Sequence, residues 1–471
     1  MARIVVAGAG VVGLGTAMVL AADGHDVTVL ERDGEPPPAS PDGSWGWRRR
    51  GVNQFRLPHY FLPRFRAVVE AELPQVAASL AEAGALAHNP LLQIPEVIRG
   101  ATRPEDHELG SLTARRPVVE WAVARAAAAT DGVELRRGVA VTALIAAPAR
   151  GNAPVCVTGV RTDGGDDIAA DLVLDMMGRR SPLPRLLEDA GARPPAEELE
   201  DCGFVYYGRH FRSRDGSQPF ALGPPVQALG TLSALTLVAD HGTWSVVLVA
   251  SAKDRAMAKL RDTGRWEQVV RALPTVAHWL DGEPLDDRVV TMSKIEDRIR
   301  RLAPHGEPVA TGVVSVGDAW ACSNPSLGRG ASLGMMHALV LRRQLRTVGT
   351  DDAGDLAAAF AAATAAEVEP WFTWTRAFDR HRLAQIDAAL AGGDYRPDDP
   401  AWDAEQALGA AAADDPELLR LFVRINSLLA LPADDFVGTE HEKRALELGG
   451  SWRDRPVPAP SRDELVRIVD A

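Results

Sequence analysis

The sequence contains little cysteine and almost no lysine. Its three cysteines, Cys156, Cys202 and Cys322, are odd in number and far apart. Such a pattern predicts neither a disulfide framework nor a zinc site, and it suits a reducing compartment. Lysine occurs only at positions 253, 259, 294 and 443 of a chain that is rich in arginine and alanine. We attribute this bias to a GC-rich bacterial genome, so that an individual arginine carries little information.

Long apolar runs and an excess of positive charge are also missing. No run approaches the roughly 18 uninterrupted apolar residues of a membrane span. The net charge of -13 argues against a nucleic-acid partner. The apolar stretch near the N-terminus is broken by residues 8–15 and leads into a strand rather than a cleavage site. We therefore predict a cytoplasmic protein without a membrane span and without a bound metal.

The first 33 residues have the pattern of one nucleotide-binding unit. A strand-like run at residues 3–7 precedes Gly8, Gly10 and Gly13, which form G-x-G-x-x-G, and a second strand-like run covers residues 26–30. The first glycine permits a tight turn, the second lets a pyrophosphate approach the backbone, and the third lets helix and strand pack closely. The helix N-terminus then offers unpaired N–H groups to phosphates.

Glu31 and Arg32 follow the second strand. Glu31 lies 23 residues after Gly8, where a carboxylate accepts hydrogen bonds from a ribose hydroxyl in dinucleotide-binding folds. Because glycines fall in loops for many reasons, a chance cluster is the alternative interpretation. The two flanking strands and the acid that follows the second one favour a dinucleotide site.

The remaining chain changes character several times. Periodicity and turn signals predict helices at residues 60–83 (broken at Pro74), 117–130 and 330–348, and strands at residues 133–145, 171–176 and 313–316. Antiparallel strands are expected at residues 204–211, 232–238 and 243–249. From residue 357 onward the chain is mostly helical, and a capping box of Ser461 and Glu464 opens its last helix.

These patterns predict an α/β fold. We expect a Rossmann-like nucleotide domain, in which helices flank a parallel sheet, assembled from separated segments at residues 1–90, 113–190 and 295–385. An antiparallel-sheet substrate domain would comprise residues 91–112 and 191–294, and a helical C-terminal region residues 386–471.

Three further motifs support a family resemblance. Gly317-Asp318-Ala319 ends a strand and leads through Asn324-Pro325-Ser326-Leu327-Gly328-Arg329-Gly330 into a helix. Asp175-Met176-Met177-Gly178 follows another strand, and Arg115-Arg116-Pro117 opens the middle helix. With the N-terminal unit, these motifs resemble FAD-dependent monooxygenases of the para-hydroxybenzoate hydroxylase fold over residues 1 to about 385. Residues 51–54, His59 and Tyr206-Tyr207-Gly208-Arg209 resemble the bacterial flavin epoxidase-like branch.

The resemblance implies FAD as the cofactor. Asp318 would accept hydrogen bonds from the ribityl hydroxyls, Arg116 would reach the ribityl and phosphate region, and N–H groups near Gly328 would face the N1/O2 side of the isoalloxazine. The simpler alternatives are a turn acid for Asp318 and a solvated arginine for Arg116. The expected FAD-binding residues are Gly8, Gly10, Val12, Gly13, Glu31, Arg32, Arg116, Asp318, Pro325, Gly328, Gly330 and Ala331.

The chain departs from the family pattern at two places. Met177 stands where direct users of NADPH carry an acid, and no second G-x-G-x-x-G is present. We expect NADH or NADPH as the reductant, supplied directly or through a partner flavin reductase. Flavin halogenases of this fold need a lysine early in the chain, whereas the first lysine here is Lys253. The sequence Trp45-Gly46-Trp47 comes too early to be the halogenase signature.

The leading hypothesis is therefore an FAD-dependent monooxygenase of secondary metabolism. It would use molecular oxygen, through a flavin C4a-hydroperoxide, to epoxidise or hydroxylate a hydrophobic, natural-product-like molecule. Pocket candidates are His59, Tyr206, Tyr207 and Arg209, with His210 beside them, and none forms a recognisable acid–base pair. The alternatives are a dehydrogenase or reductase of the same fold, and a binding module that holds a lipid-like ligand without redox chemistry.

Overall fold

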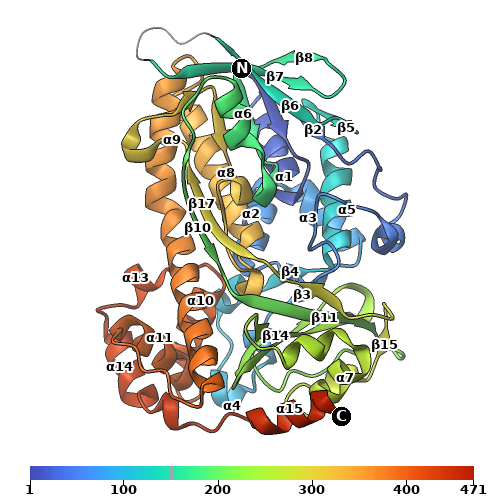
Figure 1. Ribbon diagram of the computed structural model, residues 1–471, viewed down its shortest axis with the longest axis vertical. Coiled ribbons are helices and arrows are strands. Elements are labelled where there is room, and N and C mark those ends of the chain that lie inside the picture. Colours follow the sequence, from blue (N-terminus) through green and yellow to red (C-terminus); the bar gives the residue numbers. More distant parts are fainter. Residues whose placement is uncertain (148–152) are drawn as a thin grey trace.

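A five-stranded parallel sheet forms the centre of the upper half of the protein (Figure 1). The computed structural model describes residues 1–147 and 153–471. In the order β19-β9-β1-β2-β5, the sheet strands are β19 (Val313–Ser315), β9 (Leu172–Asp175), β1 (Arg3–Ala7), β2 (Asp26–Glu31) and β5 (Val133–Arg137). Strands β1, β9 and β19 are almost entirely buried, as their continuous apolar sequences require of a sheet covered on both faces.

Helices cover one face of this sheet. Helix α1 (Val11–Ala21) packs between α5 (Arg116–Ala128) and α8 (Gly330–Thr347), and nearly all of its side chains are buried. Helices α2 (Pro63–Glu72) and α3 (Pro74–Glu82) extend the layer, with the predicted break at Pro74. A helix that is apolar on all sides, such as α1, is stable only in an interior position.

A smaller sheet lies across the other face. It comprises β18 (Ala310–Thr311), β7 (Val155–Thr162), β6 (Val141–Ala147) and β8 (Asp167–Ala169), with α6 (Leu183–Asp189) against it. The prediction of one strand at residues 133–145 is wrong, because β5 belongs to the parallel sheet and β6 to the smaller one. Gly138 separates them with a φ of +73°, a left-handed conformation that glycine adopts without strain.

The lower right of the protein is an antiparallel sheet (Figure 1). Its strands are β11 (Phe204–Arg212), β12 (Val226–Leu229), β13 (Leu232–Val238), β14 (Thr243–Ser251), β15 (Glu283–Pro284) and β16 (Val290–Met292). Helices α7 (Thr263–Arg271) and α15 (Arg462–Asp470) cover one face. The predicted capping box at Ser461 and Glu464 opens α15 and is confirmed.

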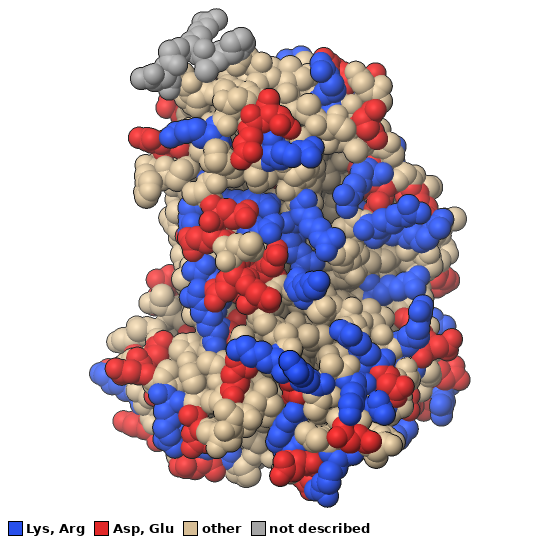
Figure 2. Space-filling view, in the orientation of Figure 1, with Lys and Arg blue, Asp and Glu red and all other residues tan. Residues whose placement is uncertain are grey.

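A long ribbon joins the two halves. Strands β10 (Ala196–Asp201) and β17 (Glu296–Arg301) pair over their full length, and β20 (Ala321–Cys322) joins β17. Ion pairs stitch the ribbon together, among them Arg301–Glu198 at 2.7 Å, and acidic and basic side chains lie next to one another over it (Figure 2). Exposed ion pairs of this kind individually contribute little to the stability of the protein.

The C-terminal helices occupy the left side and the bottom of the molecule (Figure 1). They are α9 (Ala353–Glu367), α10 (Glu369–Leu390), α11 (Pro400–Ala411), α12 (Pro416–Asn426), α13 (Pro432–Asp435) and α14 (Glu440–Gly449). Asp399 and Asp415 cap α11 and α12, each before a proline at the first helical position. Among the described helices, none combines the length and apolar composition that spanning a bilayer demands. The predicted α/β fold class is confirmed.

Candidate functional site

A large cavity of about 1070 Å³ opens between the parallel sheet, the antiparallel sheet and the C-terminal helices. It begins at the carboxyl ends of β1, β2, β9 and β19, where open α/β sheets bind nucleotides. All the residues that the sequence predicts to bind FAD line this cavity, namely Gly8, Gly10, Val12, Gly13, Glu31, Arg32, Arg116, Asp318, Pro325, Gly328, Gly330 and Ala331.

The three glycines of the N-terminal unit each meet a different steric demand. A Cβ on Gly8 would lie 2.3 Å from the carbonyl oxygen of Met176, and its φ is +115°. A Cβ on Gly13 would lie 2.1 Å from the carbonyl oxygen of Gly8, because helix and strand pack closely there. A Cβ on Gly10 would meet nothing within 4 Å, so this residue faces open space at the start of α1. This cradle fits a pyrophosphate.

Glu31 is held rigidly at the end of β2. It is buried, and its carboxylate accepts hydrogen bonds from the N–H of Ala9 at 3.1 Å and the N–H of Asp33 at 2.9 Å. Arg49 donates to it at 3.0 Å. No sequence pattern singles out Arg49, which lies in a run of three arginines and whose neighbour Arg48 is exposed.

A buried chain of charges continues from Arg49 along the cavity. Arg49 donates to Glu120 at 2.7 Å, and Arg116 donates to the other carboxylate oxygen of Glu120 at 2.9 Å. Arg116 Nη1 also lies 2.9 Å from His59 Nε2. Glu120 therefore links Arg49, which holds Glu31, to Arg116, which lies beside Asp318.

His59 is neutral and fully engaged in this chain. Its Nδ1 lies 2.9 Å from the carbonyl oxygen of Leu57, so Nδ1 carries the proton and Nε2 accepts from Arg116. Burial, together with the charge of Arg116, lowers the pKa of His59 to about 3. Because both ring nitrogens are occupied, His59 positions Arg116 and is not a free base.

Asp318 faces the cavity from the turn that follows β19. Burial raises the pKa of Asp318, and the charges of Arg116 and Arg179 oppose that rise. Within the described residues no hydrogen bond acts on its carboxyl group, which leaves both oxygens for a ligand. The preceding residue is fixed from behind, because Gly317 donates its N–H to Nδ1 of His337 at 3.3 Å.

The loop after Asp318 ends at the N-terminus of α8. Gly328 has a φ of +66°, and Gly330 begins the helix. The cradle at α1, the carboxylates of Glu31 and Asp318, and this second helix N-terminus lie along one cavity, and their chemistry fits FAD.

Strand β11 divides the predicted substrate residues between its two faces. Tyr206 lines the cavity with Leu235, Val247 and Met292 of neighbouring strands. Tyr207 and Arg209 lie on the opposite face against α7 and outside the cavity, where Arg209 pairs with Glu267 at 2.6 Å. His210 is buried beside Trp45, also outside the cavity. Side chains of a strand alternate between its faces, so the period of two separates these neighbours.

A polar cluster that the sequence did not reveal lies behind Tyr206. The Tyr206 hydroxyl donates to Asn324, and Asn324 and Ser326 donate to Asp379 Oδ1 of α10 at 2.9 and 3.2 Å. Asp379 Oδ2 is buried and has no partner in the described structure. Burial, together with the nearby Asp297, raises the pKa of Asp379 to about 8.

The comparisons with known proteins agree with this geometry. Residues 3–116 match the family described as FAD dependent oxidoreductase. The glycine cradle, the cavity and this match together make the protein an FAD-dependent oxidoreductase. The chain is 29% identical to Protein Rv3254 of Mycobacterium tuberculosis over 470 residues, an alignment that covers 92% of each chain.

Two solved structures illustrate the similarity of fold. One is PqsL of Pseudomonas aeruginosa, a probable FAD-dependent monooxygenase, with a TM-score of 0.57 and 16% identity over 83% of this chain and 98% of that chain. The other is OxyS anhydrotetracycline hydroxylase of Streptomyces rimosus, with a TM-score of 0.55 and 21% identity over 91% of this chain and 76% of that chain. At these identities the likeness concerns the fold.

Proposed function

We propose that the protein is an FAD-dependent monooxygenase that inserts one atom of molecular oxygen into a hydrophobic, natural-product-like substrate. The observation that carries this proposal is the shape of the cavity. Its nucleotide half continues without a partition into a chamber walled by Leu235, Val247 and Met292. An apolar substrate in that chamber would lie directly against the flavin ring, away from water.

FAD would supply the oxygen chemistry, and the chain would bind and orient it. The N–H groups at the start of α1 would hold the phosphates, Glu31 the adenosine ribose and Asp318 the ribityl chain. Arg116, fixed by Glu120 and His59, would hold a positive charge at the flavin. The N-terminus of α8 would stabilise negative charge on the reduced ring. The apolar chamber would exclude water.

We further propose epoxidation, or hydroxylation of a carbon that needs no prior deprotonation. Removal of a phenol proton favours a base near the substrate. His59 is occupied at both nitrogens, and Tyr206 donates its hydroxyl proton to Asn324. Tyr207 and Arg209, the other two candidates, lie outside the cavity. These contacts favour an alkene-containing substrate and the epoxidase-like branch.

The electron donor would be NADH or NADPH, acting directly or through a partner flavin reductase. Met177 lines the cavity at the position where direct users of NADPH in the resembled family carry an acid. This substitution favours a partner that delivers the electrons.

An isotope experiment tests the proposal. The FAD-loaded protein is supplied with NADH or NADPH, with and without a flavin reductase, and with a panel of apolar alkenes and phenols under heavy-isotope oxygen gas. We expect products that carry one heavy oxygen atom from the gas and none from labelled water. Oxidised products without label from the gas would instead show a dehydrogenase, and turnover that yields only hydrogen peroxide would contradict oxygen insertion.

A further inference from the structure

The C-terminal helices contribute one wall of the cavity. Helix α12 contributes Leu419, Phe422, Val423 and Asn426 to the lining. Gly409 of α11 and the two alanines that follow this helix also line the cavity. These residues come from a part of the chain far from both the nucleotide unit and the antiparallel sheet. The fold therefore brings the C-terminal helical region to the wall of the substrate chamber.

The segment before α5 forms the adjoining wall. It contains the 3₁₀ turn Leu91–Gln93 and α4 (Glu96–Arg99), and Ile94 and Ile98 line the cavity from it. Leu91 and Leu109 of this segment are buried against Leu419 and Phe422 of α12. In this part of the cavity the described lining residues, at positions 88–98 and 409–427, include no Asp, Glu, Lys or Arg. Such a space admits an uncharged apolar molecule and rejects an ion, which would lose its hydration without gaining a partner.

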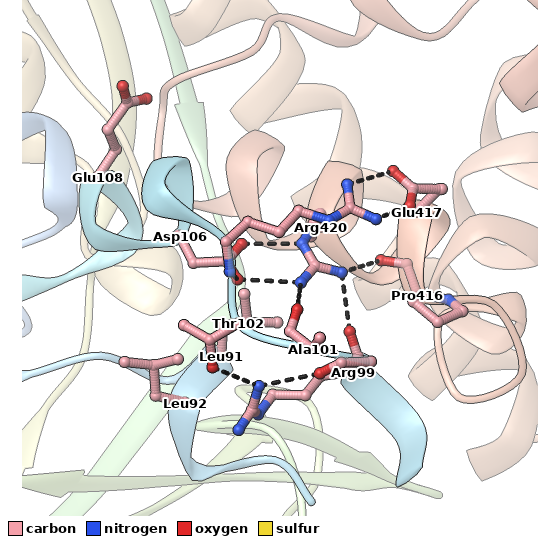
Figure 3. Close-up of polar contacts among 12 residues, drawn as sticks. Leu91, Leu92, Arg99, Ala101, Thr102, Asp106, Glu108, Pro416, Glu417 and Arg420 are labelled. Atoms are coloured by element: carbon pink, nitrogen blue, oxygen red, sulfur yellow. Dashed lines mark hydrogen bonds and ion pairs between the residues drawn. The ribbon is translucent and has the colours of Figure 1, made fainter. Parts of the chain in front are cut away.

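One buried arginine joins these two walls (Figure 3). Arg420 of α12 donates from Nε and Nη2 to the two carboxylate oxygens of Asp106, at 2.8 and 2.9 Å. The same guanidinium donates to the carbonyl oxygens of Arg99 at 2.8 Å and Ala101 at 2.9 Å, and to that of Pro416 at 3.2 Å. All five N–H donors of the guanidinium are thus used.

Asp106 is equally constrained. It is 1% exposed, and its Oδ2 also accepts the N–H of Arg103 at 2.8 Å. Burial alone would raise the pKa of Asp106, but the hydrogen bonds from Arg420 and Arg103 hold it below its usual value. A planar, bidentate pair of this kind fixes orientation as well as distance.

A second ion pair between the same walls provides a natural comparison. Arg424 lies one turn after Arg420 on α12 and reaches Glu108 at 3.3 Å. Both side chains are exposed, at 38% and 64%. This pair has the same charges and joins the same two segments as Arg420 and Asp106. Because water screens it, it holds the two segments together only weakly.

We propose that α12 is the selectivity wall of the substrate cavity. Phe422 and Val423 set the size of the uncharged apolar molecule that fits, and Arg420 is a positioning residue that holds α12 against residues 91–109. The inference rests on the proposed function only in calling the ligand a substrate, because the wall and its clamp are properties of the cavity itself.

Binding of two uncharged aromatic probes to the FAD-loaded protein tests the wall. The dissociation constants of naphthalene and the larger pyrene are measured by probe fluorescence. Val423→Phe narrows the chamber, so pyrene should bind about tenfold more weakly because overpacking is costly, while naphthalene should change little. Phe422→Ala should shift the preference toward pyrene. Leu446→Phe, at an exposed position of α14 outside the cavity, is the control and should change neither.

The clamp is tested by the ratio of the two dissociation constants. Arg420→Met should reduce the discrimination between naphthalene and pyrene with the flavin spectrum unchanged, Arg420→Lys should restore part of it, and Arg424→Met should leave it at the wild-type value. A general loss of stability would weaken both probes alike and would not move the ratio. Should Arg420→Met fail to fold, the comparison of Arg420→Lys with Arg424→Lys decides the same question.

If both Val423→Phe and Phe422→Ala keep the wild-type ratio of the two dissociation constants, α12 is not a selectivity wall. If a folded Arg420 variant keeps that ratio, Arg420 does not position α12 for selectivity. Probe binding requires no oxygen chemistry. If the variants show these shifts but the protein inserts no oxygen, the selectivity wall is supported and the proposed function is contradicted. If the protein inserts oxygen but the variants bind both probes as the wild type does, the proposed function is supported and the selectivity wall is contradicted.

Discussion

Arg49 is the residue that connects Glu31, the acid predicted to bind the ribose, to the rest of the cavity. It is 6% exposed and pairs with Glu31 and Glu120. Neither its neighbours nor its spacing distinguishes it from the other arginines, so only the fold reveals its part. Glu31, by contrast, is placed by the pattern of strand, glycines and strand, because the end of β2 is a fixed point of that unit.

Removal of Arg49 should destabilise the protein more than removal of its neighbour. Arg49→Met leaves Glu31 buried without this cation and leaves Glu120 paired with Arg116. Loss of one partner of a buried pair costs about 3–5 kcal/mol. Arg48 is exposed and reaches only Glu35 at 3.1 Å, so Arg48→Met should change the free energy of unfolding by less than about 0.5 kcal/mol. Urea denaturation of the two variants measures the difference. Equal effects would contradict the role of Arg49.

Asp379 gives the stability of the protein a pH dependence of defined sign. Its pKa is raised to about 8 when folded and is about 3.9 in an unfolded chain. Between these values the folded state binds the proton and the unfolded state does not. The stabilising contribution of Asp379 to the free energy of unfolding is therefore lost as the pH rises. Asp379→Asn keeps an uncharged acceptor for Asn324 and Ser326 and removes this loss.

The free energy of unfolding of Asp379→Asn minus that of the wild type should therefore increase with pH between about pH 4 and about pH 8. The increase should be up to about 1.4 kcal/mol per pH unit. Denaturation at several pH values measures this difference. Asp394→Asn, at a side chain that is 82% exposed, should show none. A difference that is flat with pH would mean that Asp379 is ionised throughout this range.

At the scale of elements, strand β11 separates binding from packing by the alternation of its side chains. Tyr206→Phe removes the hydroxyl that donates to Asn324 at the cavity wall and should alter the affinity for an apolar probe such as pyrene. Arg209→Met acts on the other face, where it breaks the pair with Glu267, and should lower the midpoint of thermal unfolding without altering probe affinity. Fluorescence titration and a thermal melt measure both. Reversed effects would contradict this assignment of faces.

Other elements show what local pattern can and cannot predict. The strands β1 and β2, the break at Pro74 and the capping box at Ser461 follow from local signals, and the structure confirms them. The division of residues 133–145 between two sheets depends on which strands lie nearby in space. A single glycine, Gly138, marks the boundary, and many glycines in the chain mark nothing comparable.

At the scale of the molecule, the cavity could be predicted only in part. The half that we expect to hold FAD is lined by short motifs, from Gly8 to Ala331, whose spacing can be recognised in the sequence. Its substrate half is made of apolar residues from β11, β13, β14, α4, α11 and α12, which have no motif in common. Contacts such as Arg420–Asp106 join residues more than three hundred positions apart, and a single sequence contains no record of them.

We expect this cavity to hold FAD. The visible absorption spectrum of the freshly purified protein, with mass identification of whatever cofactor heat releases, tests this expectation. We expect the two visible bands of oxidised flavin and recovery of FAD. A colourless protein that also fails to bind added FAD would contradict it.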